Sequence, residues 1–352
     1  KIISKVKKLS KNGIEIFRTF DALNDFNNIE FSIKEVKRIG KHAQGTIAYT
    51  TSPVHNLETW LELAKKIEDS GADSLAIKDM AGLLRPYDAY NLVKSLKESL
   101  SIPIHMQTHA TTGMSPATNM KAIEAGIDNI DTSISSLSMT YGHTATETML
   151  AIFEGQDRHL DLDLEALEEV STFFKDIREK YSEFEGSLKG VDSTMLVKQV
   201  PGGMLSNLES QLRANKQEDK VDLVKDEIPK VRKDFGYPPL VTPASQIVGA
   251  QALLNVMDGV SYKNLSNESI NLLKGKYGKL PGSIKKELKK RVDGLEGIDQ
   301  TIDENELELM KDELSELCSQ NSLPDLSKND EMLLSYILFP NIALKFFKNL
   351  NL

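Results

Sequence analysis

The chain has 352 residues, of which 40% are apolar, a net charge of −9 and one cysteine, Cys318. An acidic chain without a basic cluster argues against nucleic acid as a partner, and a single cysteine excludes an internal disulfide and fits a reducing compartment. No apolar run approaches the ~20 residues that span a bilayer, so we expect a cytoplasmic protein of about two domains, or the soluble face of a membrane complex.

The first twelve residues predict the end of a helix. Apolar residues from Ile2 to Leu9 share one stripe, and Asn12-Gly13 is typical of a helix stop. No initiator Met, signal peptide or targeting segment precedes this helix. We therefore expect that the chain begins inside a βα unit and that earlier units are missing.

Five strand-like segments follow, and helical periodicity fills the intervals between them. They recur every 26 to 30 residues and read IFRTFD, GTIAYT, LAIKDMAG, IHMQTHAT and IDTSISS. A TIM barrel of about 250 residues in eight units has roughly 31 residues per unit. Because five units cannot close an eight-stranded barrel, either the sheet is open or the chain has lost its beginning, and the first twelve residues favour loss. We therefore predict an α/β fold with a partial TIM barrel, about five of eight units, and an exposed parallel edge at residues 17–21.

Polar side chains collect where the third and fourth of these strands end. The side-chain period of a strand places Gln107 and His109 on one face, and the preceding strand aims Lys78 into the same space. A site at the C-terminal rim of parallel strands is built in this way. His105 shares the face of Gln107 but lies deeper, so we interpret it as a packing residue.

The βα period stops near residues 155–164, and helical patterns follow. We predict helices over 162–181, 207–215, 221–235 and 243–256. This divides the chain into a partial barrel, residues 1–155, and a mostly helical domain, residues 156–352. The acidic stretch 293–330 predicts either a solvated helix or a mobile arm.

The order of the motifs resembles one family along essentially the whole chain. They read FRTFDALND, AQGTIAYTTSPVH, IKDMAGLL, HATTGM, SMTYGHTATET, PGGMLSNLESQL, FGYPPLVTPASQIVGAQA and YILFPNIALKFF. The family is that of the biotin-dependent carboxyltransferases, which includes the oxaloacetate decarboxylase alpha subunit, the carboxyltransferase domain of pyruvate carboxylase and the transcarboxylase subunit. The segment SMTYGHTATET looks most like the oxaloacetate decarboxylase branch.

The resemblance implies a divalent metal (Zn, Mn or Co) at the rim of an eight-stranded barrel. In the family the ligands are an aspartate on the first strand, a carbamylated lysine and two histidines spaced HxH. Lys78 occupies the lysine position and His109 the second histidine, whereas Gln107 replaces the first histidine. A glutamine offers only a neutral carbonyl oxygen, a weaker donor than imidazole.

The strand with the aspartate, and the family's substrate-binding glutamine and arginine, precede the residues present. We therefore expect an impaired fragment that binds metal weakly, and Gln107→His should tighten binding. The parent protein could still turn over if the aspartate, the carbamate, His109 and a water held the metal, with Gln107 in contact with these ligands.

Thr242 matches the threonine whose hydroxyl relays a proton between biotin N1 and the substrate enolate in this family. A hydroxyl both donates and accepts, so it can carry a proton without becoming an ion. The alternative is structural, because Thr242-Pro243 also suits the start of a helix.

Three further features of the sequence have mainly structural interpretations. For Arg18 and Asp21 we predict a mutual ion pair or a loop anchor. His55 and His143 lie in loops near the rim, and we assign neither a role in the chemistry. Gly202-Gly203 predicts a tight turn.

The implied reaction is carboxyl transfer between carboxybiotin and pyruvate or oxaloacetate through a metal-stabilised enolate. No Ala-Met-Lys-Met biotinylation motif is present, so biotin belongs to a separate subunit or to a domain after residue 352. The implied partners are this biotin carrier, a second copy in a homo-oligomer and, in the decarboxylase branch, membrane subunits. Two alternatives stay open: an HxH-type metal-dependent aldolase or condensing lyase, and a catalytically dead scaffold.

Overall fold

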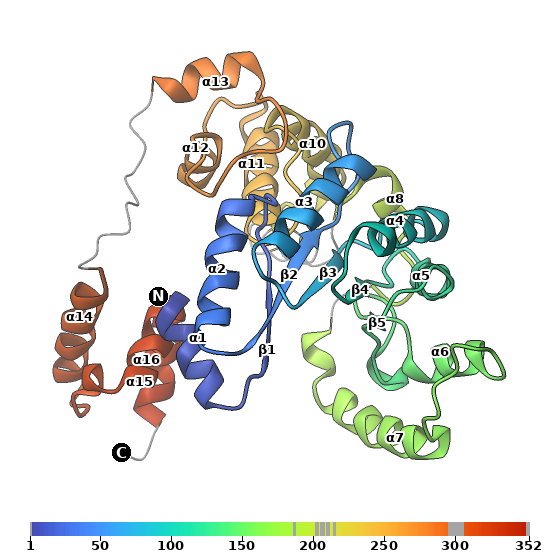
Figure 1. The fold of residues 1–352 in the computed structure, drawn as a ribbon. Helices are drawn as coiled ribbons and strands as arrows, with labels where there is room; N and C mark the ends of the chain where they lie inside the picture. The colour runs from blue at the N-terminus through green and yellow to red at the C-terminus, as the bar shows by residue number, and fades with distance from the viewer. Residues whose placement is uncertain are drawn as a thin grey trace. The chain divides into compact units, whose positions relative to one another are not determined.

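In the computed structural model of the protein, five parallel strands form one sheet in the order β1-β2-β3-β4-β5 (Figure 1). The strands are β1 (Ile16–Thr19), β2 (His42–Ala48), β3 (Ser74–Asp79), β4 (Ile104–Thr108) and β5 (Asn129–Ile130). The register aligns Ala48 with Lys78, and Lys78 with Gln107. The predicted run of five βα units is confirmed, and β1 forms one edge of the sheet.

The structure describes residues 2–185, 188–200, 204, 208, 212–213, 216–294 and 306–349. The predicted turn at Gly202-Gly203 lies outside these residues, as does most of the predicted helix 207–215. The helices of the first part are α1 (Ile2–Lys11), α2 (Phe26–Arg38), α3 (Leu57–Asp69), α4 (Pro86–Ser99), α5 (Ser115–Glu124), α6 (Thr146–Phe153) and α7 (Leu164–Lys180). Those of the second part are α8 (Thr194–Lys198), α10 (Val221–Asp234), α11 (Ala244–Asp258), α12 (Asn267–Leu273), α13 (Lys286–Asp293), α14 (Glu306–Gln320), α15 (Asp330–Leu338) and α16 (Pro340–Asn349).

Alternation along the strands separates a helix-covered face from a polar face. The odd-numbered residues of β2 and β3 are buried, and a Cβ on Gly45 would lie 2.3 Å from Ile67 of α3 and 3.2 Å from Ile33 of α2. Only glycine lets these helices pack so close to the strand. The even-numbered residues of these strands therefore point to the opposite face, which carries Lys78.

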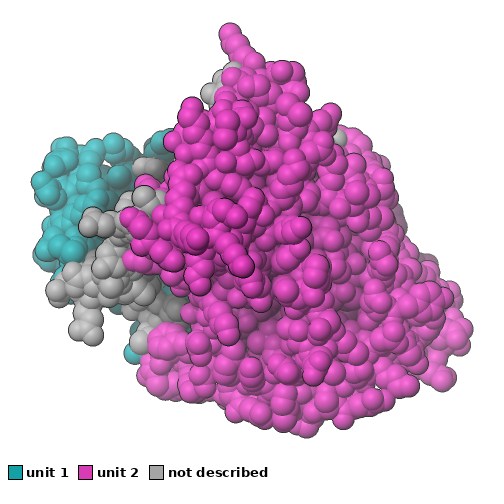
Figure 2. Space-filling view, turned by 90° about the horizontal axis from the view of Figure 1, so that it is seen from above, with its two compact units in different colours: residues 1–15, 298–352 teal, residues 16–297 magenta. Residues whose placement is uncertain are grey.

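The chain forms two compact units, residues 16–297 and residues 1–15 with 298–352 (Figure 2). Both ends of the sequence thus contribute to the smaller unit. Its buried residues include Leu314, Cys318 and Phe347 of α14 and α16. Our boundary near residues 155–164 lies inside the larger unit and stays a prediction.

Within the larger unit, α10, α11, α12 and α13 pack around a core that includes Ile228, Phe235 and Val248. Arg232 of α10 is 6% exposed and joins this helical core to the end of β2. Its guanidinium donates to the Pro238 carbonyl (3.0 Å), to Thr50 Oγ1 (2.8 Å) and to the side chain of Gln199. Arg232 therefore fixes the segment after α10, which leads to residue 242.

Two predicted elements differ from the structure in length. β5 has only two residues, because just two residue pairs join it to β4, and residues 131–134 leave the sheet. Part of the acidic stretch 293–330 forms α14, which favours a helix for that part. Among the described residues, no helix combines the length and the apolar character that crossing a membrane requires.

Candidate active site

The predicted metal-site residues meet at the C-terminal ends of β3 and β4. Lys78 Nζ donates to Gln107 Oε1 at 3.0 Å and lies 5.2 Å from the centre of the Phe20 ring. His109 follows β4 directly, and its ring centre is 4.6 Å from that of His143 in the loop after β5. We call Lys78, Gln107, His109 and His143 the rim group.

The main chain fixes the orientation of both imidazoles in the rim group. His109 Nδ1 lies 2.6 Å from the Tyr141 carbonyl, and His143 Nδ1 lies 3.0 Å from the Thr108 carbonyl. A carbonyl can only accept, so each Nδ1 carries the hydrogen and each Nε2 keeps its lone pair in the neutral ring. Burial lowers the pKa of His109 to about 4, despite the Tyr141 carbonyl, which makes His109 neutral at physiological pH.

Asp79 locks the ends of β3 and β4 together. Its buried carboxylate accepts from the Leu83 and Leu84 amides and from Thr108 Oγ1, at 2.8 to 2.9 Å. Burial is the largest influence and raises the pKa of Asp79 to about 6. Gly82 permits this close approach, since a Cβ there would lie 2.6 Å from the His109 carbonyl. Asp79 follows Lys78 and Thr108 precedes His109, so the hydrogen bond between Asp79 and Thr108 fixes the spacing of Lys78 from His109.

A second set of polar residues lies on the same face, nearer the start of the strands. Arg18 donates to Gln44 Oε1 at 2.5 Å and to Asp131 Oδ2 at 2.6 Å. His105 Nε2 lies 2.5 Å from Asp131 Oδ1, and Gln44 Nε2 donates to Ser74 Oγ at 3.0 Å. We call Arg18, Gln44, Ser74, His105 and Asp131 the inner group.

The inner group corrects one prediction. Arg18 pairs with Asp131, 113 residues away, and not with Asp21. Asp21 is a loop anchor, in line with the alternative interpretation, because its carboxylate accepts from the Leu23 and Asp25 amides. Arg18 instead points along the polar face, because the two-residue period gives it the same side as Gln44.

The surroundings favour the charged form of Asp131 in the inner group and the neutral form of Lys78 in the rim group. Burial would raise the pKa of Asp131, but hydrogen bonds from His105 and Arg18 outweigh it and hold that pKa well below its usual range. Burial lowers the pKa of Lys78, and Arg18 lowers it further, while Asp131 opposes this. Lys78 is consequently closer to its neutral, nucleophilic amine form than an exposed lysine.

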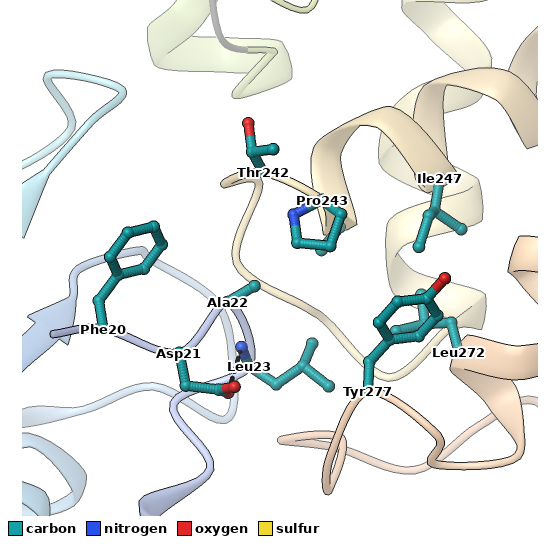
Figure 3. A pocket seen from close by; sticks show the side chains of 10 residues that line it. Phe20, Asp21, Ala22, Leu23, Thr242, Pro243, Ile247, Leu272 and Tyr277 are labelled. Atoms are coloured by element: carbon teal, nitrogen blue, oxygen red, sulfur yellow. Dashed lines mark hydrogen bonds between the residues drawn. The ribbon is translucent and has the colours of Figure 1, made fainter. Parts of the chain in front are cut away.

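Thr242 lines a cavity of about 210 Å³ together with Phe20, Leu23, Leu272 and Tyr277 (Figure 3). Figure 3 shows Thr242 on the turn that precedes the helix carrying Ile247, and Phe20 on the loop after β1. Phe20 also lies beneath Lys78 Nζ, so one side chain borders both the cavity and the rim group.

The structural alternative for Thr242 is a helix cap, and the hydrogen bonds do not support it. Pro243 occupies the N-cap position of α11, and no side chain caps that helix. Thr242 is exposed and makes no hydrogen bond through its hydroxyl with any described residue, so this group is free to meet a ligand.

The donor atoms of the rim group suit a divalent cation if Lys78 is carbamylated. No three His, Cys, Asp or Glu side chains converge anywhere in the described residues. A carbamate oxygen on Lys78, the Gln107 carbonyl oxygen and His109 Nε2 would nevertheless supply one anionic and two neutral donors of the kinds that Zn, Mn and Co accept. Each predicted metal-site residue is thus in the rim group, whereas Thr242 lines the neighbouring cavity.

Sequence reasoning missed the functional setting of Phe20, Asp131 and His143. The two-residue period of β1 places Phe20 and Arg18 on the face of Lys78, so the sequence could have predicted that both lie near the rim. Asp131 lies in the predicted strand IDTSISS but follows β5, which ends at Ile130, and His143 comes from an irregular segment, so no period gives the direction of either side chain.

Comparison with known proteins covers both parts of the chain. Residues 195–351 match the family model described as a conserved carboxylase domain, and residues 9–174 match the model described as HMGL-like.

Two curated relatives are similar along nearly all of the chain. A pyruvate carboxylase subunit of Methanocaldococcus jannaschii is 47% identical over 344 residues, which cover 97% of this chain and 60% of that protein. The methylmalonyl-CoA carboxyltransferase 5S subunit of Propionibacterium freudenreichii subsp. shermanii is 44% identical, over 98% of this chain and 68% of that protein. The chain thus spans about 60% of the first of these relatives.

A solved structure has the same fold. The carboxyl transferase domain of Rhizobium etli pyruvate carboxylase, determined with pyruvate, superposes with a TM-score of 0.89 at 28% identity. The match covers 98% of this chain and 60% of that one, so the five-stranded sheet is part of a TIM-barrel type fold.

Proposed function

Because this chain belongs to the biotin-dependent carboxyltransferase family, we propose that it transfers a carboxyl group between biotin and a 2-oxo acid of the pyruvate type. The observation that supports this most is the meeting of Lys78, Gln107 and His109 at the rim, with Phe20 between Lys78 and the Thr242 cavity. Biotin would be carried on a separate domain.

Lys78 is suited to become a carbamate. Its lowered pKa increases the share of neutral amine, whose lone pair can attack the carbon of CO₂. The new N–C bond forms as a C=O π pair moves onto oxygen, and the nitrogen releases one proton. The product is an anionic oxygen donor close to the Gln107 side chain, since the Nζ that bears it already contacts Oε1 at 3.0 Å.

Lys78 as its carbamate, Gln107 Oε1 and His109 Nε2 would hold the divalent cation. When bound, such a cation supplies Lewis-acid stabilisation of negative charge on the 2-oxo oxygen of the substrate. His109 contributes a neutral lone pair, because burial keeps its pKa at about 4.

Thr242 would move a proton between biotin N1 and the reacting carbon of the substrate. Its exposed hydroxyl can donate to one atom while it accepts from the other. Arg232 supports this role from a distance, because it binds the Pro238 carbonyl four residues before Thr242. The guanidinium is a positioning group and does not border the cavity.

The direction of transfer distinguishes two versions of the proposal. Both curated relatives are named as a carboxylase or a carboxyltransferase, which favours carboxylation of pyruvate over an oxaloacetate decarboxylase coupled to membrane subunits. Assay of the full-length protein in both directions, with and without its biotin carrier, separates these versions. An aldolase-type lyase would turn over without biotin, and a dead scaffold would oligomerise without turnover.

The test of the catalytic assignment is Thr242→Ala in the full-length protein. General acid–base contributions are worth about 10²–10⁴-fold, so we expect a loss of that size in carboxyl transfer, with part of the rate restored in Thr242→Ser. Thr172→Ala on α7 is the matched control. Activity is measured by oxaloacetate formation, beside a thermal melt. Full activity in Thr242→Ala would show that the hydroxyl does not move the proton and that Thr242 has only a structural role.

A further inference from the structure

We propose that His143 provides a second imidazole ligand for the divalent cation of the rim group, in the role left open by Gln107. This inference rests on the proposed function for the presence of a cation, and it concerns a residue to which no sequence motif assigned a role. It starts from the pairing of two imidazoles whose Nε2 atoms have no partner among the described residues.

The two rings are prepared as metal ligands by the bonds that their other nitrogens make. Metal-bound histidines almost always donate the second ring N–H to a carbonyl or carboxylate, which fixes tautomer and orientation. His109 and His143 both do so, through Tyr141 and Thr108. Neither Nε2 makes a hydrogen bond with any described residue, and both rings are partly exposed, so a cation could reach them.

The separation of the rings fits binding to one ion. With metal–nitrogen bonds of about 2.0–2.1 Å, two imidazoles on one cation have ring centres about 4.5 Å apart at a right angle and about 5.2 Å apart in a tetrahedron. The observed distance is 4.6 Å, with the ring planes tilted by 54°. Stacking for its own sake would favour nearly parallel planes or a perpendicular edge contact.

Each imidazole binds the main chain of the segment that carries the other, so the pair is held rigidly. His109 reaches Tyr141, His143 reaches Thr108, and the Ala110 amide donates to the Gly142 carbonyl at 2.9 Å. Met139 and Thr140, just before this contact, have φ of 62° and 50°. Non-glycine residues adopt this left-handed region at a cost that the surrounding structure must hold, a feature common at functional sites.

A second imidazole would change which metals the site prefers. With carbamate and amide oxygens and one nitrogen, the donor set suits Mn as well as Zn or Co. With two nitrogens, it shifts toward Co and Zn. We therefore expect cobalt to bind the full-length protein in a form that has both imidazoles in its coordination sphere.

The test uses cobalt as a spectroscopic probe in the full-length protein, freed of metal by a chelator and supplied with bicarbonate. The visible absorption of Co²⁺ reports its ligands, and competition with a chelator gives its affinity. Loss even of an outer partner of a metal-bound histidine costs about 10–100-fold in affinity, so His143→Ala should weaken cobalt binding at least about 100-fold and change the spectrum. His159→Ala, at an exposed histidine, is the control.

The exchange variant Gln107→His with His143→Ala sharpens the test, because it moves the second imidazole to the strand. If His143 fills the role left by Gln107, this double variant should recover most of the cobalt affinity that His143→Ala loses. Far-ultraviolet circular dichroism of each variant checks that the fold is intact. His143→Gln provides a second measurement should the alanine variant fold poorly.

Unchanged cobalt affinity and spectrum in folded His143→Ala or His143→Gln would overturn the inference. These readouts do not depend on turnover, so the inference and the proposed function can fail separately. Cobalt held by both histidines without any carboxyl transfer would support the inference and contradict the function. Carboxyl transfer by the wild type, together with wild-type cobalt binding by His143→Ala, would support the function and contradict the inference.

Discussion

The rim group and the inner group lie on the same face of the sheet, yet only the inner group satisfies its own polar atoms. Arg18, Asp131 and His105 are joined by contacts of 2.5 to 2.6 Å, and Ser74 completes the set through Gln44. In the rim group, Lys78 has the Gln107 carbonyl, while two imidazole Nε2 atoms have no described partner. Residues a few positions apart on the same strands thus differ in pairing: the inner group is joined internally, and the rim group keeps nitrogen atoms that a ligand can meet.

The difference follows from the cost of burying polar groups. A buried charge needs a counterion and hydrogen bonds, which Arg18 and Asp131 give one another. At the rim, His109 is neutral, so a free ring nitrogen there costs less than an unpaired charge and leaves room for binding. Removing residues from the two groups should therefore affect different measurements.

Lys78→Met should have the largest effect on activity and little effect on stability. Loss of the carbamate would remove a metal contribution of several kcal/mol, which corresponds to about 10³-fold in rate. Removal of a half-buried amine should leave the free energy of unfolding unchanged or slightly higher. Carboxyl-transfer rates and urea unfolding of the full-length protein measure both, beside Lys94→Met on the exposed side of α4. If Lys78→Met lowered the free energy of unfolding but left the protein active, the rim group would contribute stability and not activity, contrary to the proposed difference between the two groups.

Asp131→Asn should show the opposite pattern. It leaves Arg18 without its counterion; such losses cost about 3–5 kcal/mol for fully buried pairs, and we expect about 2 kcal/mol because this pair is partly exposed. The side chains of Arg18 and Asp131 are 26% and 25% exposed. Urea unfolding against exposed Asp161→Asn gives the value, and cobalt affinity should change little. A cost below about 0.5 kcal/mol would show that the inner group contributes little stability.

His55 extends the comparison to an imidazole outside both groups. Its ring stacks on Trp60 at 5.1 Å, and burial, followed by Arg232, lowers its pKa to about 4. In the unfolded chain the His55 ring takes up a proton at about pH 6.5, whereas in the folded protein it stays neutral down to about pH 4. The stability that His55 contributes is therefore present above about pH 6.5 and is lost as the pH falls toward 4. The stability difference between wild type and His55→Gln should therefore shift by about 2 kcal/mol between about pH 7.5 and about pH 4.5.

Urea unfolding at each pH measures this shift, and His159→Gln serves as the control because its side chain is exposed. A difference that does not vary with pH would mean that His55 titrates alike in the folded and unfolded states.

Ser74→Ala should have the smallest effect, since it removes neutral hydrogen bonds only. The serine hydroxyl contacts Gln44 Nε2 and His42 Nε2, at 3.0 and 2.7 Å. A hydrogen bond contributes about 1 kcal/mol, and the partly exposed His42 can bond to water in place of the serine. The cost should therefore be close to that of the one buried bond to Gln44 and below that of Asp131→Asn. Chemical unfolding beside Ser99→Ala, at the exposed end of α4, provides the measurement. A larger loss than for Asp131→Asn would reverse the ranking of the inner group.

The sequence by itself determined the five parallel strands and the first members of the rim group. Their recurrence every 26 to 30 residues and the two-residue period are consequences of local geometry, which any parallel βα unit must obey. Lys78, Gln107 and His109 were therefore placed at one rim without knowledge of the tertiary structure. Thr242 was identified through the family motif alone, since its place in the same cavity as Phe20 follows no local rule.

Tertiary structure alone decided the contacts between irregular segments. The partner of Arg18 is 113 residues away, and His143 reaches His109 through a loop with two left-handed residues, whose path no repeat encodes. The smaller unit likewise joins residues 1–15 to 298–352, which are distant in the sequence. Periodic elements repeat their own geometry, whereas loops adopt the conformation that the packed elements around them allow, and that conformation places the second imidazole beside the first.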